Sequence, residues 1–117
     1  MNLDDSNNRS GLLAGGNWII DQVKMIDVYP KHEQLANILD HSQGTGGSPY
    51  NVLLDLAKLG ASFPLVGAGL VGQDVLGEYI FENCRVNGID PTFISVSPGT
   101  STSYTDVMTE VEGGRRT

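Results

Sequence analysis

The sequence predicts an α/β protein with a parallel sheet and a smaller, separate β-layer attached to that core. The first observation is the order of its apolar segments, which alternate strand, helix, strand, helix, strand with short connections. The second is that residues 18–40 and 102–117 are rich in strand-forming residues but too polar for a sheet buried on both faces. The third is glycine, with 15 of 117 residues, about 13% against an average usage of about 7%. One domain is expected, over residues 11–117.

Composition and charge narrow the classes of function. Lys and Arg total 7 against 14 for Asp and Glu, which gives a net charge of −7 and a pI near 4.5. Such a chain repels phosphate backbones and anionic lipid headgroups, so no nucleic acid and no membrane is expected as a partner. The single cysteine, Cys84, excludes an internal disulfide and fits a reducing compartment. Residues 1–10 lack the basic and apolar regions of a signal peptide, which predicts a disordered tail on a cytoplasmic protein.

The first part of the chain predicts three strands. Residues 12–16 are an apolar run stopped by two glycines, which is typical of a buried strand and its turn. Residues 18–29 are rich in β-branched and aromatic residues, end at Pro30 and alternate imperfectly, which predicts a bent or bulged strand. Residues 35–40 are the candidate antiparallel partner of that strand.

The clearest helix comes next. Ser48 suits the N-cap, Pro49 suits the first helical position, and Gly60 suits the position just past the end. Its predicted apolar face is formed by Val52, Leu53, Leu56, Ala57 and Leu59.

The rest of the chain predicts one more helix and several short strands. The helix is expected to begin after Asp74 as its N-cap and to end at Asn87-Gly88, with Leu76, Ile80 and Cys84 facing inward. Strands are expected at 63–66, closed by Gly67, at 93–96, at 102–111, and at 115–117 after a Gly113-Gly114 turn.

One motif suggests a dinucleotide site. Gly67-Ala68-Gly69-Leu70-Val71-Gly72 matches G-x-G-x-x-G, and an acidic residue, Asp90, follows further along. The motif should follow the first strand of its fold, whereas a strand and a helix precede it here. Asp90 also comes before the next strand instead of ending it. A nicotinamide-dependent dehydrogenase is therefore the alternative, and glycines that permit tight packing are the simpler interpretation.

A glycine-rich segment, 44–48, precedes the first helix. No Gly-Lys-Ser/Thr follows it, so it is not a P-loop, and Tyr50 stands where a nucleophile elbow needs its last glycine. Gly46 and Gly47 would let backbone N–H groups approach a ligand, and Asn51 offers a donor and an acceptor one turn later. An ordinary capped turn fits the same spacing.

Other candidate residues have plainer explanations. Asp21 lies among apolar neighbours, where a ligand or exposure to solvent would each account for a carboxylate. His32 and His41 have no second ligand at metal spacing and are expected at the surface, so no metal site is predicted. With no nearby histidine, Cys84 is expected to pack inside its helix rather than act as a nucleophile.

Taken in order, these motifs resemble the N-terminal signature of the ribokinase-like (phosphofructokinase-B type) family of carbohydrate kinases. Three blocks carry the resemblance: Gly46-Gly47-Ser48-Pro49-Tyr50-Asn51 for G-G-x-x-x-N, Leu56-Ala57-Lys58-Leu59-Gly60 for L-A-x-L-G, and Gly69-Leu70-Val71-Gly72-Gln73-Asp74-Val75-Leu76-Gly77 for G-x-V-G-x-D-x-x-G. The segments 87–90, 102 and 113–117 extend it, so it covers about residues 11–117. It implies a Rossmann-like core with a β-sheet lid at 18–40 and 102–117.

The resemblance also implies a function and roles for residues. The family phosphorylates a hydroxyl of a sugar or nucleoside with ATP and Mg²⁺. By position, Asp21 would hold sugar hydroxyls, Gly46 and Gly47 would let the backbone approach the sugar, and Asn51 would be its amide ligand. Gly72 and Asp74 would be structural, ending a strand and capping a helix.

Two departures from the family pattern stand out. Many members have an asparagine two residues before the aspartate, where this chain has Ile19; the nearest asparagine is Asn17, a further candidate substrate ligand. This departure weakens the implication that the sugar is ribose. The family's catalytic Gly-Ala-Gly-Asp and the segments that hold Mg²⁺ and adenine have no match here.

We therefore expect the N-terminal, sugar-binding part of a kinase, with no catalytic residue in this chain and no activity of the part alone. Such a part could form a homodimer through the lid. The remaining alternatives are the dehydrogenase and a sugar-binding or interaction domain without catalysis.

Overall fold

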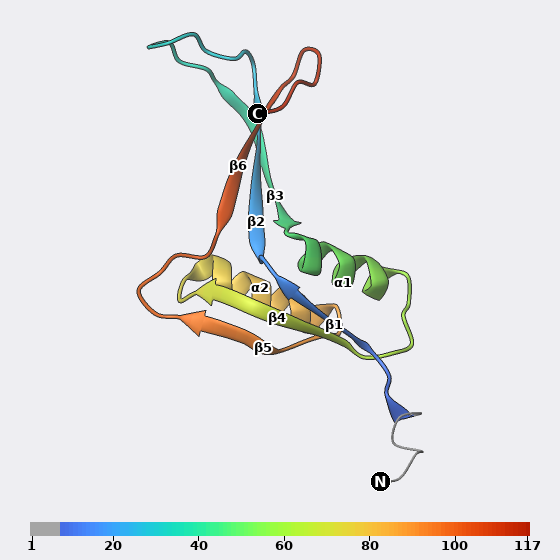
Figure 1. Cartoon of the computed structure of the whole chain (residues 1–117). Coiled ribbons are helices and arrows are strands. Elements are labelled where there is room, and N and C mark those ends of the chain that lie inside the picture. Colours follow the sequence, from blue (N-terminus) through green and yellow to red (C-terminus); the bar gives the residue numbers. More distant parts are fainter. Residues whose placement is uncertain (1–7) are drawn as a thin grey trace.

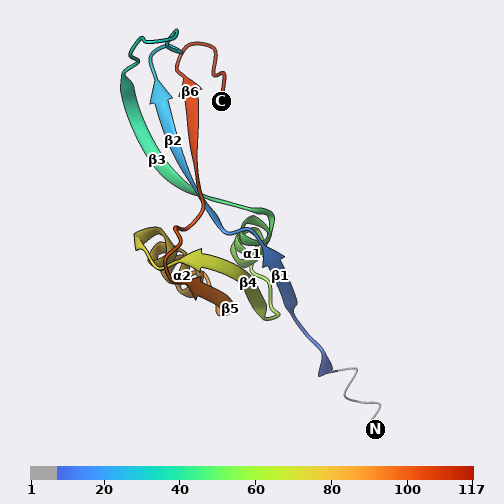
Figure 2. The same ribbon diagram turned by 60° about the vertical axis from the view of Figure 1, so that its left-hand side comes forward.

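A computed structural model describes residues 8–117, and its core is a three-stranded parallel sheet (Figure 1). The strands are β1 (Leu12–Gly16), β4 (Leu65–Gly72) and β5 (Ile89–Ser97), in the order β1-β4-β5. Helices α1 (Ser48–Lys58) and α2 (Val75–Val86) lie on the same face of this sheet (Figures 1 and 2). The fold is thus α/β with a parallel sheet, as the sequence predicts.

The second sheet stands apart from this core (Figures 1 and 2). It consists of β2 (Ile19–Ile26), β3 (Ile38–Gly46) and β6 (Tyr104–Glu110), in the order β3-β2-β6. β2 pairs antiparallel with β3 and parallel with β6, and its register shifts between Met25 and Ile26, so the predicted bulge is present. The prediction of a separate β-layer is confirmed.

The predicted bounds of β3 are wrong, because the strand lies at Ile38–Gly46 and not at 35–40. Its last three residues pair with Ile19, Ile20 and Asp21 of β2. Backbone pairing therefore includes Gly44, Thr45 and Gly46, which glycine content alone assigned to a loop.

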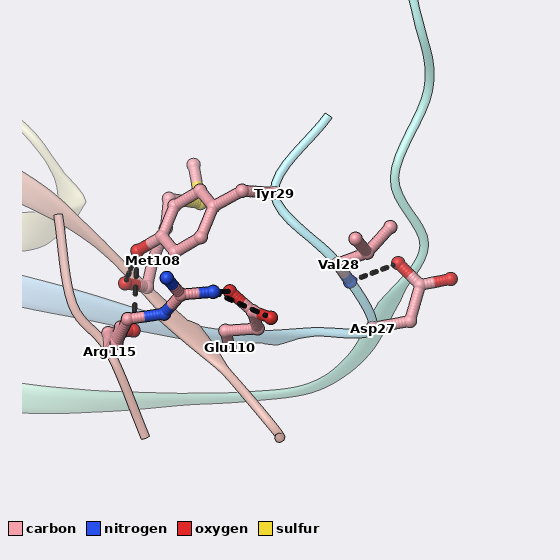
Figure 3. A network of polar contacts seen from close by, with 6 residues as sticks. All are labelled: Asp27, Val28, Tyr29, Met108, Glu110 and Arg115. Atoms are coloured by element: carbon pink, nitrogen blue, oxygen red, sulfur yellow. Dashed lines mark hydrogen bonds and ion pairs between the residues drawn. The ribbon is translucent and has the colours of Figure 1, made fainter. Parts of the chain in front are cut away.

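Side-chain contacts hold the distal end of the second sheet together, as Figure 3 shows. The Tyr29 hydroxyl donates to the Met108 carbonyl at 2.7 Å, and Arg115 pairs with the Glu110 carboxylate at 3.0 Å. The predicted returning strand at 115–117 is reduced to a single antiparallel bridge between Thr109 and Arg116. The predicted tail, 1–10, lies mostly outside the described residues, and residues 8–10 are exposed.

Helix α1 buries a face that is turned from the predicted one but still includes Leu53, with Leu56 and Ala57 packed at its edge. Its buried residues are Pro49, Tyr50, Leu53 and Leu54. Two of the predicted core residues are exposed: Val52 by 46% and Leu59 by 82%. The Tyr50 ring packs against Trp18, with ring centroids 4.7 Å apart, and this contact turns the Tyr50 side of the helix inward. The N-cap is also corrected, since Gly47 occupies it and no side chain caps the helix.

Strands β4 and β5 are longer than predicted, because β4 runs through Gly67 to Gly72 and β5 spans Ile89–Ser97 rather than 93–96, whereas helix α2 agrees with the sequence. Helix α2 begins after Asp74 and buries Ile80 and Cys84, as predicted. The Tyr50 hydroxyl of α1 donates to Asn83 of α2 at 2.6 Å, which joins the two helices. Within residues 8–117, no helix is long and apolar enough to cross a membrane.

Candidate functional site

The residues singled out by the sequence gather where the two sheets meet. The chain crosses this junction three times: between β1 and β2, between β3 and α1, and between β5 and β6. Asp21 lies on β2, Gly46 ends β3, and Asn51 lies in the first turns of α1. Parallel strands of an α/β sheet present their carboxyl ends at such an edge, where ligands of these folds bind.

Asp21 and Gly46 are in direct contact. A Cβ atom built on Gly46 would lie 2.8 Å from Asp21 Oδ1, so glycine makes room for the carboxylate. Asp21 is half-buried, and no hydrogen bond or ion pair among residues 8–117 engages its oxygens. The carboxylate therefore keeps its capacity to accept hydrogen bonds.

Gly47 has a backbone conformation and a close backbone neighbour that other residues would not tolerate. Its φ of +94° lies in the region that favours glycine, and a Cβ there would lie 2.0 Å from the carbonyl oxygen of Asn17. Asn17 is exposed and lines a hollow of about 600 Å³ together with Gly15, Gly16, Trp18, Gly69 and Ser103. The structure thus brings Asn17 to Gly47, while the other predicted ligands lie outside the lining of this hollow.

Asn51 is exposed, and its amide is held by a residue that the sequence analysis missed. The Thr45 hydroxyl donates to Asn51 Oδ1 at 2.9 Å, and the Asn51 backbone N–H donates to the Gly47 carbonyl at 3.0 Å. No hydrogen bond joins Asn51 to Asp21 within the described part of the chain. Thr45 could not be found from sequence because 44–48 was interpreted as a loop, which leaves its side chain without a defined direction.

Asp74 joins helix α2 to the start of β6. Its carboxylate accepts from the Gly77 backbone N–H at 2.9 Å, from the Thr102 backbone N–H at 2.7 Å and from the Thr102 hydroxyl at 2.6 Å. The same hydroxyl accepts from the Gly72 N–H at 2.9 Å. Hydrogen bonds from Thr102, and then from Gly77, lower the pKa of Asp74. Thr102 is 2% exposed, and its link to Asp74 could not be predicted because the two positions lie 28 apart along the chain.

The G-x-G-x-x-G motif is not a turn. Gly67, Gly69 and Gly72 all lie within β4, so no glycine loop opens onto a helix there. The side chain of Trp18 occupies the space over Gly67 and Gly69, and its Nε1 donates to the Ala68 carbonyl at 2.8 Å. The dehydrogenase alternative loses its structural basis, and tight packing accounts for the glycines.

Other titratable candidates have no site around them. His32 and His41 are exposed. Cys84 is buried, and this burial raises its pKa to about 11, so the thiol stays protonated near neutral pH. No group of three or more His, Cys, Asp or Glu residues within 8–117 could hold a metal ion.

Solved structures of kinases share this fold. Ribokinase from Giardia lamblia matches with a TM-score of 0.82 at 22% identity, over 93% of this chain and 34% of that one. Arabidopsis thaliana ribokinase, solved with ribose and ATP, matches with a TM-score of 0.80 at 22% identity, over 92% and 34%. A nucleoside kinase of the ribokinase family from Methanocaldococcus jannaschii gives 0.80 at 16% identity, over 92% and 35%. The chain spans about a third of the length of these structures.

A family model agrees with the fold. The model of the pfkB family carbohydrate kinases matches residues 17–117. This range contains both helices and every strand except β1. The match also contains every residue of the candidate site, from Asn17 to Asn51. The chain therefore belongs to the pfkB family of carbohydrate kinases.

Proposed function

We propose that this chain is the sugar- or nucleoside-binding part of an ATP-dependent carbohydrate kinase that phosphorylates a substrate hydroxyl. The observation that supports it best is the half-buried Asp21 carboxylate, which lies against Gly46 at the junction of the sheets and makes no hydrogen bond or ion pair within residues 8–117. A sugar hydroxyl is a hydrogen-bond donor of the kind that such an acceptor needs. Family membership supplies the reaction class.

In this proposal each residue has a role set by its place. Asp21 accepts a hydrogen bond from a substrate hydroxyl, and Asn51 makes a second polar contact from helix α1. Gly46 and Gly47 keep the junction free of side chains, while Asn17 contributes from the far side of Gly47. The second sheet would act as a lid over the bound substrate.

ATP and Mg²⁺ would supply the phosphoryl group and its charge compensation, but the residues described here do not fit them. No acidic or histidine cluster within 8–117 could hold a metal ion, and a net charge of −7 disfavours a polyphosphate. We therefore assign no catalytic residue in this chain. A homodimer through the lid and a cytoplasmic location stay predictions.

The test is Asp21→Ala in the protein that carries this chain, with binding of D-ribose and adenosine measured by calorimetry. Each lost hydrogen bond to a charged acceptor costs about 1.5–3 kcal/mol, so affinity should fall roughly 10- to 100-fold. Asp40→Ala is the matched control, because Asp40 is an exposed carboxylate on β3 of the same sheet. Equal sugar affinity of Asp21→Ala and the unsubstituted protein would contradict the proposal.

A further inference from the structure

The Thr45–Asn51 contact joins strand β3 to helix α1 at the junction of the two sheets, where the proposed sugar site lies. Thr45 pairs with Ile20 in the second sheet, and Asn51 is anchored in α1 through its backbone bond to Gly47. Both ends of the 2.9 Å side-chain bond therefore belong to regular elements. A bond between two anchored residues fixes which end of the Asn51 amide faces which way.

An asparagine amide has one acceptor end, Oδ1, and one donor end, Nδ2. Thr45 occupies the acceptor end by donating its hydroxyl hydrogen. We propose that Thr45 is a positioning residue, which presents Asn51 to the substrate as a hydrogen-bond donor. This inference rests on the proposed function, because it concerns the same sugar site.

The consequence is a site with two groups of opposite hydrogen-bonding character. Asp21 can only accept, because an ionised carboxylate carries no hydrogen. Asn51, with its oxygen engaged by Thr45, offers its N–H groups. The substrate class that fits is a polyol, with one hydroxyl that donates to Asp21 and a second oxygen that accepts from Asn51.

The hydrogen bond from the Thr45 hydroxyl to Asn51 contributes little to the stability of the fold. Asn51 is exposed, and no buried side-chain polar atom within residues 8–117 lacks a partner. Valine has nearly the shape of threonine and suits a strand, so Thr45→Val should leave the fold intact. Loss of the hydroxyl frees the Asn51 amide to turn over, which would change substrate preference rather than stability.

The test compares sugars that differ in one atom. D-ribose and adenosine are measured against analogues in which one hydroxyl at a time is replaced by hydrogen or by fluorine. Fluorine accepts a hydrogen bond weakly and cannot donate one. At the hydroxyl that faces Asn51, the fluoro analogue should bind about two- to tenfold more tightly than the deoxy analogue. At the hydroxyl that faces Asp21, the two analogues should bind equally poorly.

Variants of Thr45 then test whether the difference in affinity between the fluoro and deoxy analogues depends on the Thr45 hydroxyl. In Thr45→Val the advantage of the fluoro analogue should disappear, whereas Thr45→Ser, which keeps the hydroxyl, should retain it. With ¹⁵N-labelled asparagine, the side-chain N–H signals of Asn51, identified by their loss in Asn51→Asp, should shift when sugar is added. Urea unfolding of all variants should be unchanged.

The outcomes separate the inference from the proposed function. If sugar binds, Asp21→Ala weakens that binding as expected, and the fluoro analogue still binds more tightly than the deoxy analogue in Thr45→Val, then the role of Thr45 is overturned while the site stands. If the unsubstituted protein binds neither ribose nor adenosine, the proposed function falls and the inference falls with it.

Discussion

At the scale of single residues, the absence of a side chain decides the packing around Trp18. This indole is 1% exposed and lies over two glycines of β4. A Cβ on Gly67 would lie 2.6 Å from the Trp18 ring, and one on Gly69 would lie 2.4 Å from it. The sequence predicted glycines needed for close packing, but it could not identify Trp18 as their partner, because Trp18 and Gly67 lie 49 positions apart along the chain.

Gly67→Ala should therefore destabilise the fold. The added methyl group would overlap a large, rigid ring that is packed on its other side by Tyr50, so the core must shift, at a cost of about 1–3 kcal/mol. The free energy of unfolding in urea measures this cost.

The matched control is Gly44→Ala in β3, where a Cβ would meet no atom within 4 Å. It should be neutral or slightly stabilising, because alanine suits a strand better than glycine does. Equal destabilisation by the two substitutions would contradict the packing argument.

At the scale of elements, the sequence predicted which strands and helices exist better than where they end. The Asp74 cap of α2 was predicted because its chemistry is local. The end of β3 was not, because long-range pairing with β2 overrides the turn chemistry of Gly44, Gly46 and Gly47. The inward face of α1 was shifted for a similar reason, since the contact with Trp18 selects the helical stripe of Tyr50, Leu53 and Leu54 over the one that contains Val52 and Leu59.

The link between α2 and β6 predicts a specific dependence of stability on pH. The folded-state pKa of Asp74 lies below its ordinary value of 3.8, chiefly because Thr102 donates to it. Its contribution to stability is therefore fully present above that ordinary value and is lost as the pH falls through the folded pKa. The difference in unfolding free energy between the unsubstituted chain and Asp74→Asn should be constant above about pH 5 and should shrink below pH 4.

Thr102→Val provides the second arm of that measurement. It removes the hydroxyl that donates to Asp74 and leaves the carboxylate in place, so the pKa of Asp74 should move back toward its ordinary value. A carboxyl ¹³C titration of Asp74 in both chains follows the shift directly. Parallel pH profiles for the unsubstituted chain and Asp74→Asn would rule out this role of the carboxylate.

At the scale of the whole molecule, both helices cover one face of the core sheet and leave the other face uncovered (Figure 2). The exposed fractions of Leu13, Leu70 and Phe93 are 62%, 67% and 61%. Parallel sheets occur almost only with both faces covered. The sequence predicted the strands of this sheet as buried, and it could not show the bare face, because that face carries apolar side chains, a pattern typical of a sheet covered on both sides.

This bare face predicts self-association of the 117-residue chain through apolar contacts. Burying a leucine or phenylalanine side chain contributes about 1.5–3 kcal/mol, so the double substitution Leu70→Lys with Phe93→Lys should weaken association by at least about 100-fold. Both side chains point into solvent, so unfolding in urea should change little. Leu35→Lys is the control, because Leu35 is 96% exposed in the loop between β2 and β3, away from the core sheet. Sedimentation velocity over a range of concentrations should show a monomer for the double variant and larger species for the other two chains. A monomer at every concentration in all three would mean that this face does not drive association.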